Sequence, residues 1–271
     1  MKDYHVHTYY SDDSIYPMKA VLADCAARGL DEVCFTDHVD YGIKKDWTEE
    51  NVDPVFSNVD YPRYFDEIDE CRKLFPDITI KAGLEFGAQM ITLDKYRELI
   101  KRYGNRLDFV LLSVHQVGNK EFWNQEFQKG KSQLEYNRGY YEELLRLVRS
   151  FKDYSVLAHL DLIVRYDRQG TLPFEDVKDV ITEILKQVIA DGKGIEVNTS
   201  SVRYQVGDLT PSVEILKLYH ELGGRVLTFG SDSHKPEHLG AHITEQMAQV
   251  KELGFTEYCT FSHGKPEFHP L

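Results

Sequence analysis

Residues 4–13 of this 271-residue chain read YHVHTYYSDD, and the interpretation of the fold begins with this stretch. Its first half is rich in β-branched and aromatic residues, which is typical of a strand. Residues two apart in a strand point to the same side, so His5 and His7 can face one point. Three polar residues follow: Ser11, Asp12 and Asp13. Alone, the histidine pair is weak evidence for a metal site, because most single histidines are structural.

Similar short runs recur along the chain and alternate with longer amphipathic stretches. We expect strands at residues 3–7, 32–38, 78–86, 108–115, 154–161, 194–200 and 225–234, with 258–263 as a weaker candidate. We expect helices at residues 17–29, 61–75, 92–103, 133–150, 173–191, 209–224 and 236–253.

Two of these helices have recognisable ends. The first has Pro17 in its first turn and stops at Gly29, the usual arrangement of these residue types. For the helix at 209–224 we expect Thr210 as the cap, followed by Pro211, and Gly223 as the stop.

Strict alternation of strands and helices predicts a parallel sheet, and about seven such units suggest that the sheet closes into a barrel. We therefore expect an α/β fold similar to a TIM barrel. The length and the even composition favour one domain over residues 1–271.

Charge and composition disfavour several classes of partner. A net charge of -13 repels nucleic acid and anionic membranes. No apolar run approaches the roughly 18 residues that span a bilayer, so we expect no membrane partner and a cytoplasmic location. The cysteines form no C-x-x-C pair, and we expect all four to be small buried residues: Cys25, Cys34, Cys71 and Cys259.

Nearly every expected strand carries a histidine or an acidic residue at or near its carboxyl end. In chain order these side chains are His5 and His7, Asp37 and His38, Glu85, His115, His159, Glu196 and Asn198, and Asp232 and His234. The carboxyl ends of barrel strands form the face where active sites are built. Clustered imidazoles and carboxylates are costly to bury without a metal ion, so the set predicts a metal site. We interpret the remaining histidines as surface or structural residues: His220, His238, His242, His263 and His269.

These residues resemble the motifs of the polymerase and histidinol phosphatase (PHP) superfamily of metal-dependent phosphoesterases. The matches occur in the family's order over nearly the whole chain: H-V-H-T near the N-terminus, T-D-H at 36–38, G-L-E at 83–85, S-V-H at 113–115, A-H-L-D at 158–161 and G-S-D-S-H at 230–234. The segment E-V-N-T-S at 196–200, followed by Arg203, and the total length resemble the histidinol-phosphate phosphatase branch.

The resemblance implies a distorted (β/α)7 barrel that holds three divalent metal ions, Zn, Mn or Fe. It implies that one metal is bound by His5, His7, Glu85 and Asp232, a second by Asp13, His38 and His234, and a third by Glu85, His115 and His159. Several family members have a histidine where Asp13 stands, so Asp12 remains open as the alternative ligand. Four further residues could hold the imidazoles in place: Asp37, Asp161, Glu196 and Asn198.

The reaction that the resemblance implies is hydrolysis of L-histidinol phosphate to L-histidinol and phosphate, a step of histidine biosynthesis. Three metal ions would attract the phosphate dianion locally in an acidic protein, and a hydroxide bridging two of them would attack it. The chain has no P-loop motif and no convincing G-x-S-x-G motif, which fits a reaction without a protein nucleophile.

Candidate substrate residues follow the ligand-bearing strands. Arg165 and Arg203 lie on such loops, where a guanidinium can bind phosphate oxygens, and Arg168 is the substitute for Arg165.

Two long connections, residues 39–60 and 116–132, are typical of lids or rims. We expect Asp40 to receive the cationic end of the substrate, and Phe122 or Trp123 to cover its ring.

Two alternatives remain open. The chain could be another PHP phosphoesterase that acts on a different small phosphate ester or on a phosphotyrosyl protein. More remotely, it could be a noncatalytic metal-binding module with the same barrel.

Overall fold

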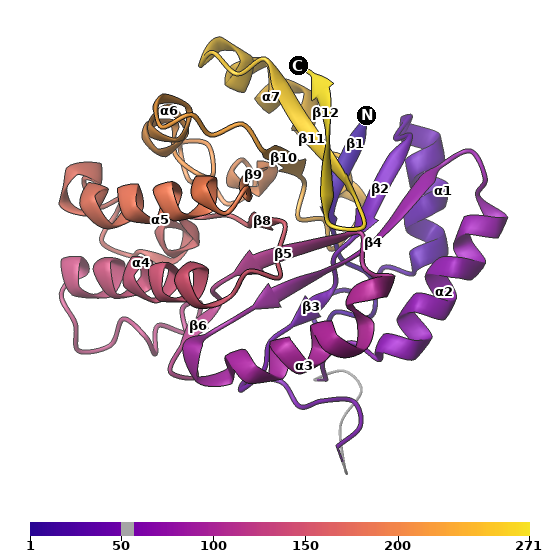
Figure 1. Ribbon diagram of the computed structural model, residues 1–271, viewed down its shortest axis with the longest axis horizontal. Coiled ribbons are helices and arrows are strands. Elements are labelled where there is room, and N and C mark those ends of the chain that lie inside the picture. Colours follow the sequence, from indigo (N-terminus) through magenta and orange to yellow (C-terminus); the bar gives the residue numbers. More distant parts are fainter. Residues whose placement is uncertain (50–56) are drawn as a thin grey trace.

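The computed structural model describes residues 1–49 and 57–271. Its centre is a parallel sheet (Figure 1). Across the sheet its strands are β1 (Lys2–Val6), β2 (Glu32–Phe35), β4 (Thr79–Gly87), β5 (Phe109–Ser113), β8 (Val156–Leu157), β9 (Gly194–Asn198) and β10 (Leu227–Gly230). A short strand, β3 (His38–Val39), continues along β4 beyond the end of β2.

The two outer strands of this order meet, so the sheet is nearly closed. Val6 pairs in parallel with Ser233, which lies just past β10. The amide of His7 donates to the carbonyl of Ser233 at 2.8 Å, and the amide of Ser233 donates to the carbonyl of His5 at 3.1 Å. The expected distorted (β/α)7 barrel is confirmed.

Helices surround the sheet on its outer side (Figure 1). They are α1 (Met18–Arg28), α2 (Tyr61–Leu74), α3 (Leu93–Tyr103), α4 (Gln133–Ser150), α5 (Lys178–Ala190), α6 (Val213–Glu221) and α7 (Ile243–Glu252). Their apolar faces and the outer faces of the strands form one large buried cluster.

The helix ends differ in part from the prediction. Pro17 is the N-cap of α1 rather than a residue of its first turn, and Gly29 ends this helix with a φ of 73°. The predicted cap of α6, Thr210, is wrong. Ser212 is the N-cap, and its hydroxyl accepts a hydrogen bond from the amide of Ile215.

Helices α5 and α7 begin later than expected. A separate 3₁₀ turn at Phe174–Asp176 precedes α5. Before α7, Gly240 and His242 have φ values of 66° and 61°, so the chain cannot be helical there.

The last strand candidate does not join the barrel. β11 (Glu257–Ser262) pairs with β12 (Lys265–Pro270) in an antiparallel hairpin. The turn residues His263 and Gly264 have φ values of 47° and 73°, which a tight two-residue hairpin turn requires. Phe261 of this hairpin packs against Phe109, the first residue of β5, and so covers the amino-terminal end of the strands.

The two long connections have different structures. In the first, Trp47 packs partly buried against the core, and residues 50–56 lie outside the described residues. The second begins with a small hairpin of β6 (Gln116–Val117) and β7 (Lys120–Glu121). Phe122 then turns into the core, while Trp123 is 63% exposed.

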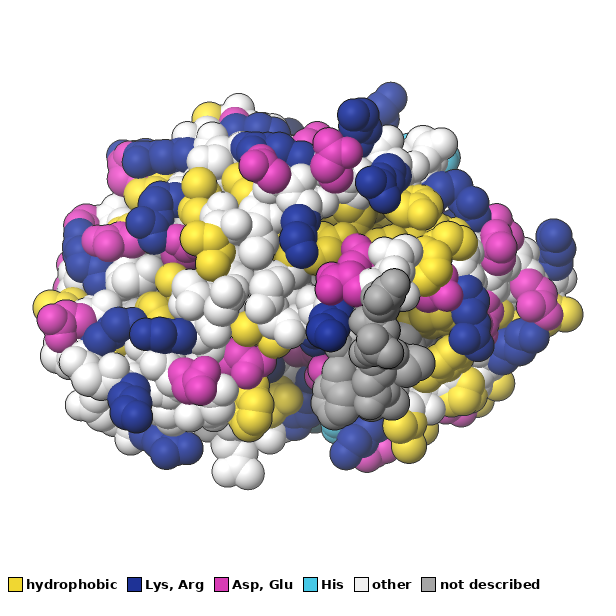
Figure 2. Space-filling model, turned by 90° about the horizontal axis from the view of Figure 1, so that it is seen from below, with side chains coloured by type: hydrophobic (Ala, Val, Ile, Leu, Met, Phe, Trp, Pro, Cys, Tyr) yellow, Lys and Arg dark blue, Asp and Glu magenta, His cyan; other side chains and the backbone are white. Residues whose placement is uncertain are grey.

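Other sequence expectations concern the cysteines and the surface. All four cysteines are buried and free, as expected. No helix in residues 1–49 and 57–271 is long and apolar enough to cross a membrane. On the face in Figure 2, acidic and basic side chains are interspersed over the surface.

Candidate metal centre

The carboxyl ends of the barrel strands bring together the predicted ligands. His5 belongs to β1, His38 to β3 and Glu85 to β4. The others lie just past the ends of strands: His7 after β1, His115 after β5, His159 after β8, and Asp232 and His234 after β10. Side chains from six strands therefore converge on one face of the barrel.

Glu85 is the centre of this cluster and is fully buried. Its two carboxylate oxygens face five imidazoles. The closest nitrogen–oxygen distances are 3.2 Å to His5, 3.5 Å to His7, 3.0 Å to His38, 3.2 Å to His115 and 2.8 Å to His159. One carboxylate thus contacts residues from all three predicted metal positions.

Asp232 is aimed at the first histidine pair by an unusual backbone conformation. Its φ of 55° lies in the left-handed region, which aspartate tolerates better than most residues. Its Oδ1 lies 3.7 Å from His5 Nε2 and 3.5 Å from His7 Nε2. Gly230 makes room for this arrangement, because a Cβ there would lie only 2.3 Å from the Cβ of His5.

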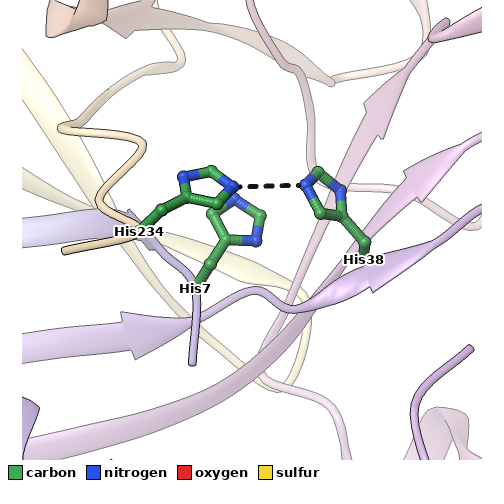
Figure 3. A group of neighbouring side chains, drawn as sticks. All are labelled: His7, His38 and His234. Carbon is green, nitrogen blue, oxygen red and sulfur yellow. Dashed lines mark hydrogen bonds between the residues drawn. The ribbon is translucent and has the colours of Figure 1, made fainter. Parts of the chain in front are cut away.

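A second group contains three histidines. The rings of His7, His38 and His234 converge in Figure 3, with His38 Nε2 and His234 Nε2 3.4 Å apart. Asp13 Oδ2 lies 3.1 Å from His234 Nε2 and 3.7 Å from His38 Nε2. Asp12 instead pairs with Lys44 at 2.5 Å. Asp13, rather than Asp12, therefore lies beside these histidines.

His115, which contacts Glu85 through Nε2, is also paired with Asp40, the residue that we expected to receive the cationic end of the substrate. Its Nδ1 lies 2.8 Å from Oδ1 of Asp40, a buried carboxylate. The other oxygen of Asp40, Oδ2, pairs with Lys44 at 2.7 Å. Asp40 is thus part of the cluster, with both oxygens engaged, instead of presenting a free carboxylate to the cleft.

Further polar residues hold the imidazoles in position. Glu196 Oε1 accepts from His5 Nδ1 at 2.6 Å, and its Oε2 accepts from the His159 amide at 2.9 Å and from Asn198 Nδ2 at 3.1 Å. Asp37 Oδ1 accepts from the hydroxyl of Ser11, which lies 3.1 Å from His7 Nδ1.

Asp161 makes no such contact within the described part of the chain. Its Oδ2 accepts from the amide of Ser212, and its Oδ1 is unpaired. The expectation that Asp161 holds an imidazole is therefore wrong.

Burial and charge oppose each other in this cluster. Burial raises the pKa of Glu85, but the neighbouring His5 and His115 outweigh this effect and hold the pKa well below its usual range. Burial lowers the pKa of His115, whereas Glu85 and Asp40 raise it to about 9. Burial together with the charge of His234 holds the pKa of His7 well below its usual range. A neutral imidazole is the form that binds a metal ion.

The donor set fits divalent metal ions. Among the described residues, three buried ring nitrogens of the cluster lack a hydrogen-bond partner: His7 Nε2, His38 Nδ1 and His159 Nδ1. His38 Nδ1 is 3.0 Å from Glu85 without the alignment of a hydrogen bond, and buried polar atoms rarely stay unpaired. Lone pairs of imidazole and carboxylate directed at a shared space suit zinc, manganese or iron.

Within residues 1–49 and 57–271, four overlapping groups have ligand atoms within 4.8 Å of one another. They are His5, His7 and Asp232; His7, His38 and His234; His5, Glu85 and His159; and His38, Asp40 and His115. These groups share members, so the cluster is continuous, and the division into three separate ligand sets remains a prediction.

The cluster borders a cleft of about 570 Å³. Arg165 lines this cleft, with its guanidinium 3.9 Å above the ring of Tyr204 and 3.5 Å from Asp232 Oδ2. Arg203 donates to the carbonyls of Ser231 at 2.7 Å and Asp232 at 2.6 Å. Arg203 therefore fixes the backbone at Ser231 and Asp232. Arg168, the alternative to Arg165 as a phosphate-binding residue, has an exposed side chain.

Of the two aromatic candidates, only Trp123 lines the cleft. Phe122 is buried against Phe127 and Tyr140 and cannot cover a ligand, so Trp123 is the alternative that remains.

The other histidines lie outside the cluster. His220 binds the carbonyl of Gly254, His269 binds Thr260, and His263 has a side chain 78% exposed.

Sequence reasoning missed Lys44 and Glu121, which also line the cleft. Lys44 lies four residues after Asp40, and this spacing could have suggested the ion pair. Glu121 carried no comparable sequence signal.

The chain is similar to known proteins over most of its length. A model of the PHP domain family matches residues 3–200. Histidinol-phosphatase of Lactococcus lactis is 31% identical over 268 residues, which cover 96% of this chain and 94% of that protein. A probable histidinol-phosphatase of Thermotoga maritima is 27% identical over 94% of this chain and 93% of its own length.

Solved structures agree with these matches. The crystal structure of the Lactococcus lactis histidinol phosphate phosphatase, complexed with zinc, L-histidinol and phosphate, superposes with a TM-score of 0.85 at 30% identity over 98% of both chains. A putative histidinol phosphatase from Listeria monocytogenes, 20% identical, has a TM-score of 0.76 over 90% of this chain and 99% of its own, and shows the same fold.

Proposed function

This chain belongs to the PHP domain family, and from that premise we propose that it is a metal-dependent phosphomonoesterase that hydrolyses L-histidinol phosphate to L-histidinol and phosphate. Its similarity to histidinol-phosphatases extends over nearly the whole chain. A cytoplasmic location and a single domain over residues 1–271 stay predictions.

One observation carries the proposal: the buried carboxylate of Glu85 faces five imidazoles. We propose three divalent ions, with the ligand sets His5, His7, Glu85 and Asp232; Asp13, His38 and His234; and Glu85, His115 and His159. When bound, such ions lower the pKa of a water molecule and offset the negative charge of a phosphate.

The protein's own residues then orient the ligands and the substrate. Glu196 fixes the ring of His5 through Nδ1, and Asp40 fixes the ring of His115 in the same way. Arg203 holds the turn that carries Asp232. Arg165 presents a guanidinium to the cleft, where it can bind phosphate oxygens.

Replacing Arg165 by leucine is therefore expected to raise KM for the phosphate ester by about 10-fold or more, the effect of losing a charged hydrogen bond. Steady-state phosphate release measures this change. Arg168→Leu, at an exposed neighbouring position, is the control and should leave KM unchanged. An unchanged KM for Arg165→Leu would remove Arg165 from the phosphate site.

The ammonium and imidazole of the substrate need a partner in the cleft. Among the described residues, Glu121 is the cleft carboxylate that pairs with no cation, since its Oε2 accepts only from Asn124 at 3.1 Å. The exposed indole of Trp123, two residues on, also lines the cleft and can cover a cationic ring. We therefore favour Glu121 over Asp40 as the residue that receives the cationic end.

Glu121→Gln should lower kcat/KM for L-histidinol phosphate by about 10-fold, because one charged hydrogen bond is weakened. The same variant should leave hydrolysis of p-nitrophenyl phosphate, which has no ammonium, unchanged. Glu126→Gln, at an exposed position of the same loop, is the control. An equal loss of kcat/KM for both substrates would show that Glu121 does not bind the ammonium of the substrate.

A screen of small phosphomonoesters tests the proposed substrate. L-Histidinol phosphate should exceed simple alkyl phosphates in kcat/KM by at least about 100-fold, because its polar groups match the cleft. A different ester or a phosphotyrosyl peptide as the best substrate would place the chain elsewhere in the family. No hydrolysis of any ester by metal-loaded protein would favour a noncatalytic module.

A further inference from the structure

Lys44 is a buried lysine beside the metal centre, with a side chain only 10% exposed. It lies in the connection that follows β3, and its amide donates to the carbonyl of Asp40 at 2.9 Å. Its side chain and Arg165 are the lysine and arginine side chains that line the cleft among the described residues.

The ammonium of Lys44 joins two carboxylates from distant parts of the chain. Its Nζ lies 2.5 Å from Asp12 Oδ1 and 2.7 Å from Asp40 Oδ2. A buried charge needs such partners, because an unpaired one is very costly to remove from water. Lys44 therefore fixes the side-chain positions of both aspartates.

Asp12 and Asp13 are adjacent residues that line the same cleft, yet their side chains have different partners. Asp13 approaches His234 Nε2 at 3.1 Å, whereas Asp12 is held by Lys44. The two residues are chemically identical, so their type cannot decide which one joins the histidines. The position of the Lys44 ammonium distinguishes them.

We propose that Lys44 is a positioning residue that selects the metal-binding aspartate: by pairing with Asp12 it leaves Asp13 as the carboxylate for His38 and His234. This inference rests on the metal centre of the proposed function. The same ammonium holds Oδ2 of Asp40, so that Oδ1 stays on His115.

Metal binding to stripped protein tests this proposal without depending on catalysis. Lys44→Met frees Asp12 to compete for the metal position, and we expect a changed visible spectrum of the Co²⁺-loaded protein and a loss of about 10-fold or more in affinity for the weakest-bound Zn²⁺. Adding Asp12→Asn to Lys44→Met should restore both properties in part, because Asp12 no longer competes while Asp40 still lacks its cation. Lys44→Arg should keep most of them, since it keeps the cation.

Two further variants distinguish a loss of positioning by Lys44 from a general change in the structure. Asp12→Asn alone keeps Lys44 and removes a residue that is not a ligand, so its Co²⁺ spectrum should match the wild type. Lys19→Met breaks a surface ion pair with Glu70 and is the matched lysine control, with no expected change in metal binding. The Asp12→Asn result tests the proposal even if Lys44→Met fails to fold.

Several results would overturn the inference. These are an unchanged Co²⁺ spectrum and Zn²⁺ affinity in Lys44→Met, a changed spectrum in Asp12→Asn alone, or no rescue in the double variant. A rise in KM with normal metal binding would make Lys44 a substrate contact instead. If the wild type itself binds no metal, the proposed function fails together with this inference. If the wild type binds metal and Lys44→Met behaves like it, only this inference fails.

Discussion

Replacing Glu85 by glutamine is expected to reduce phosphate release by more than about 100-fold. Losing a residue that only hydrogen-bonds to a metal-binding side chain already costs roughly 10–100-fold in metal affinity or activity, and Glu85 is proposed to bind the metals directly. Glu85 offers two buried oxygens to five imidazoles. Glutamine has nearly the same shape but removes the negative charge and one acceptor oxygen. Assays of phosphate release and of bound metal should therefore both show the loss.

The matched control is Glu143→Gln. Glu143 is also buried, but it lies on α4, where it accepts from the amide of Met90 and pairs with Arg146. This variant should keep its metal and its activity even if its melting temperature falls. A Glu85→Gln protein that retains full metal content and activity would show that Glu85 does not bind the metals.

Removing the metal ions with a chelator is expected to abolish phosphate release, and reloading with zinc or manganese should restore it. The stripped protein should also melt at a lower temperature, because ligands that bind only the folded state stabilise it by about 4 kcal/mol at 1,000 times their dissociation constant. Without ions, the buried ring nitrogens His7 Nε2 and His38 Nδ1 have no hydrogen-bond partner among the described residues. Activity and calorimetry before and after chelation measure both effects.

Glu85→Gln protein is the control for this experiment, because we expect chelation and reloading to change its activity and melting temperature little. Activity that survives complete metal removal, verified by elemental analysis, would contradict a metal-dependent reaction. Recovery of activity with zinc or manganese, but not with Ca²⁺, would support imidazole ligands, because Ca²⁺ prefers oxygen ligands.

The barrel and most of the cluster were predictable because they depend on regular features of the chain. The runs that contain His5, Glu85 and His115 have clear strand patterns, and the carboxyl ends of parallel strands must meet at one face. The last run was harder to place. Residues 258–263 have the apolar character of a barrel strand, and the turn at His263 and Gly264 decides that they form a hairpin.

Details of the site depend on contacts that sequence order does not reveal. Asp12 and Asp13 are neighbours, and Lys44, which separates their roles, comes 31 residues after Asp13 in the sequence. Phe122 and Trp123 are also adjacent, but one side chain enters the core and the other stays exposed. In such pairs the residue types agree with either arrangement, and only the packing around them decides.

The number of metal ions bound per chain tests the central claim most directly. Elemental analysis of purified protein, after loading with zinc or manganese and removal of the excess, should find three ions per chain in the wild type and fewer in Glu85→Gln. Wild-type protein that binds no zinc, manganese or iron under these conditions would contradict the metal centre and the reaction proposed for it.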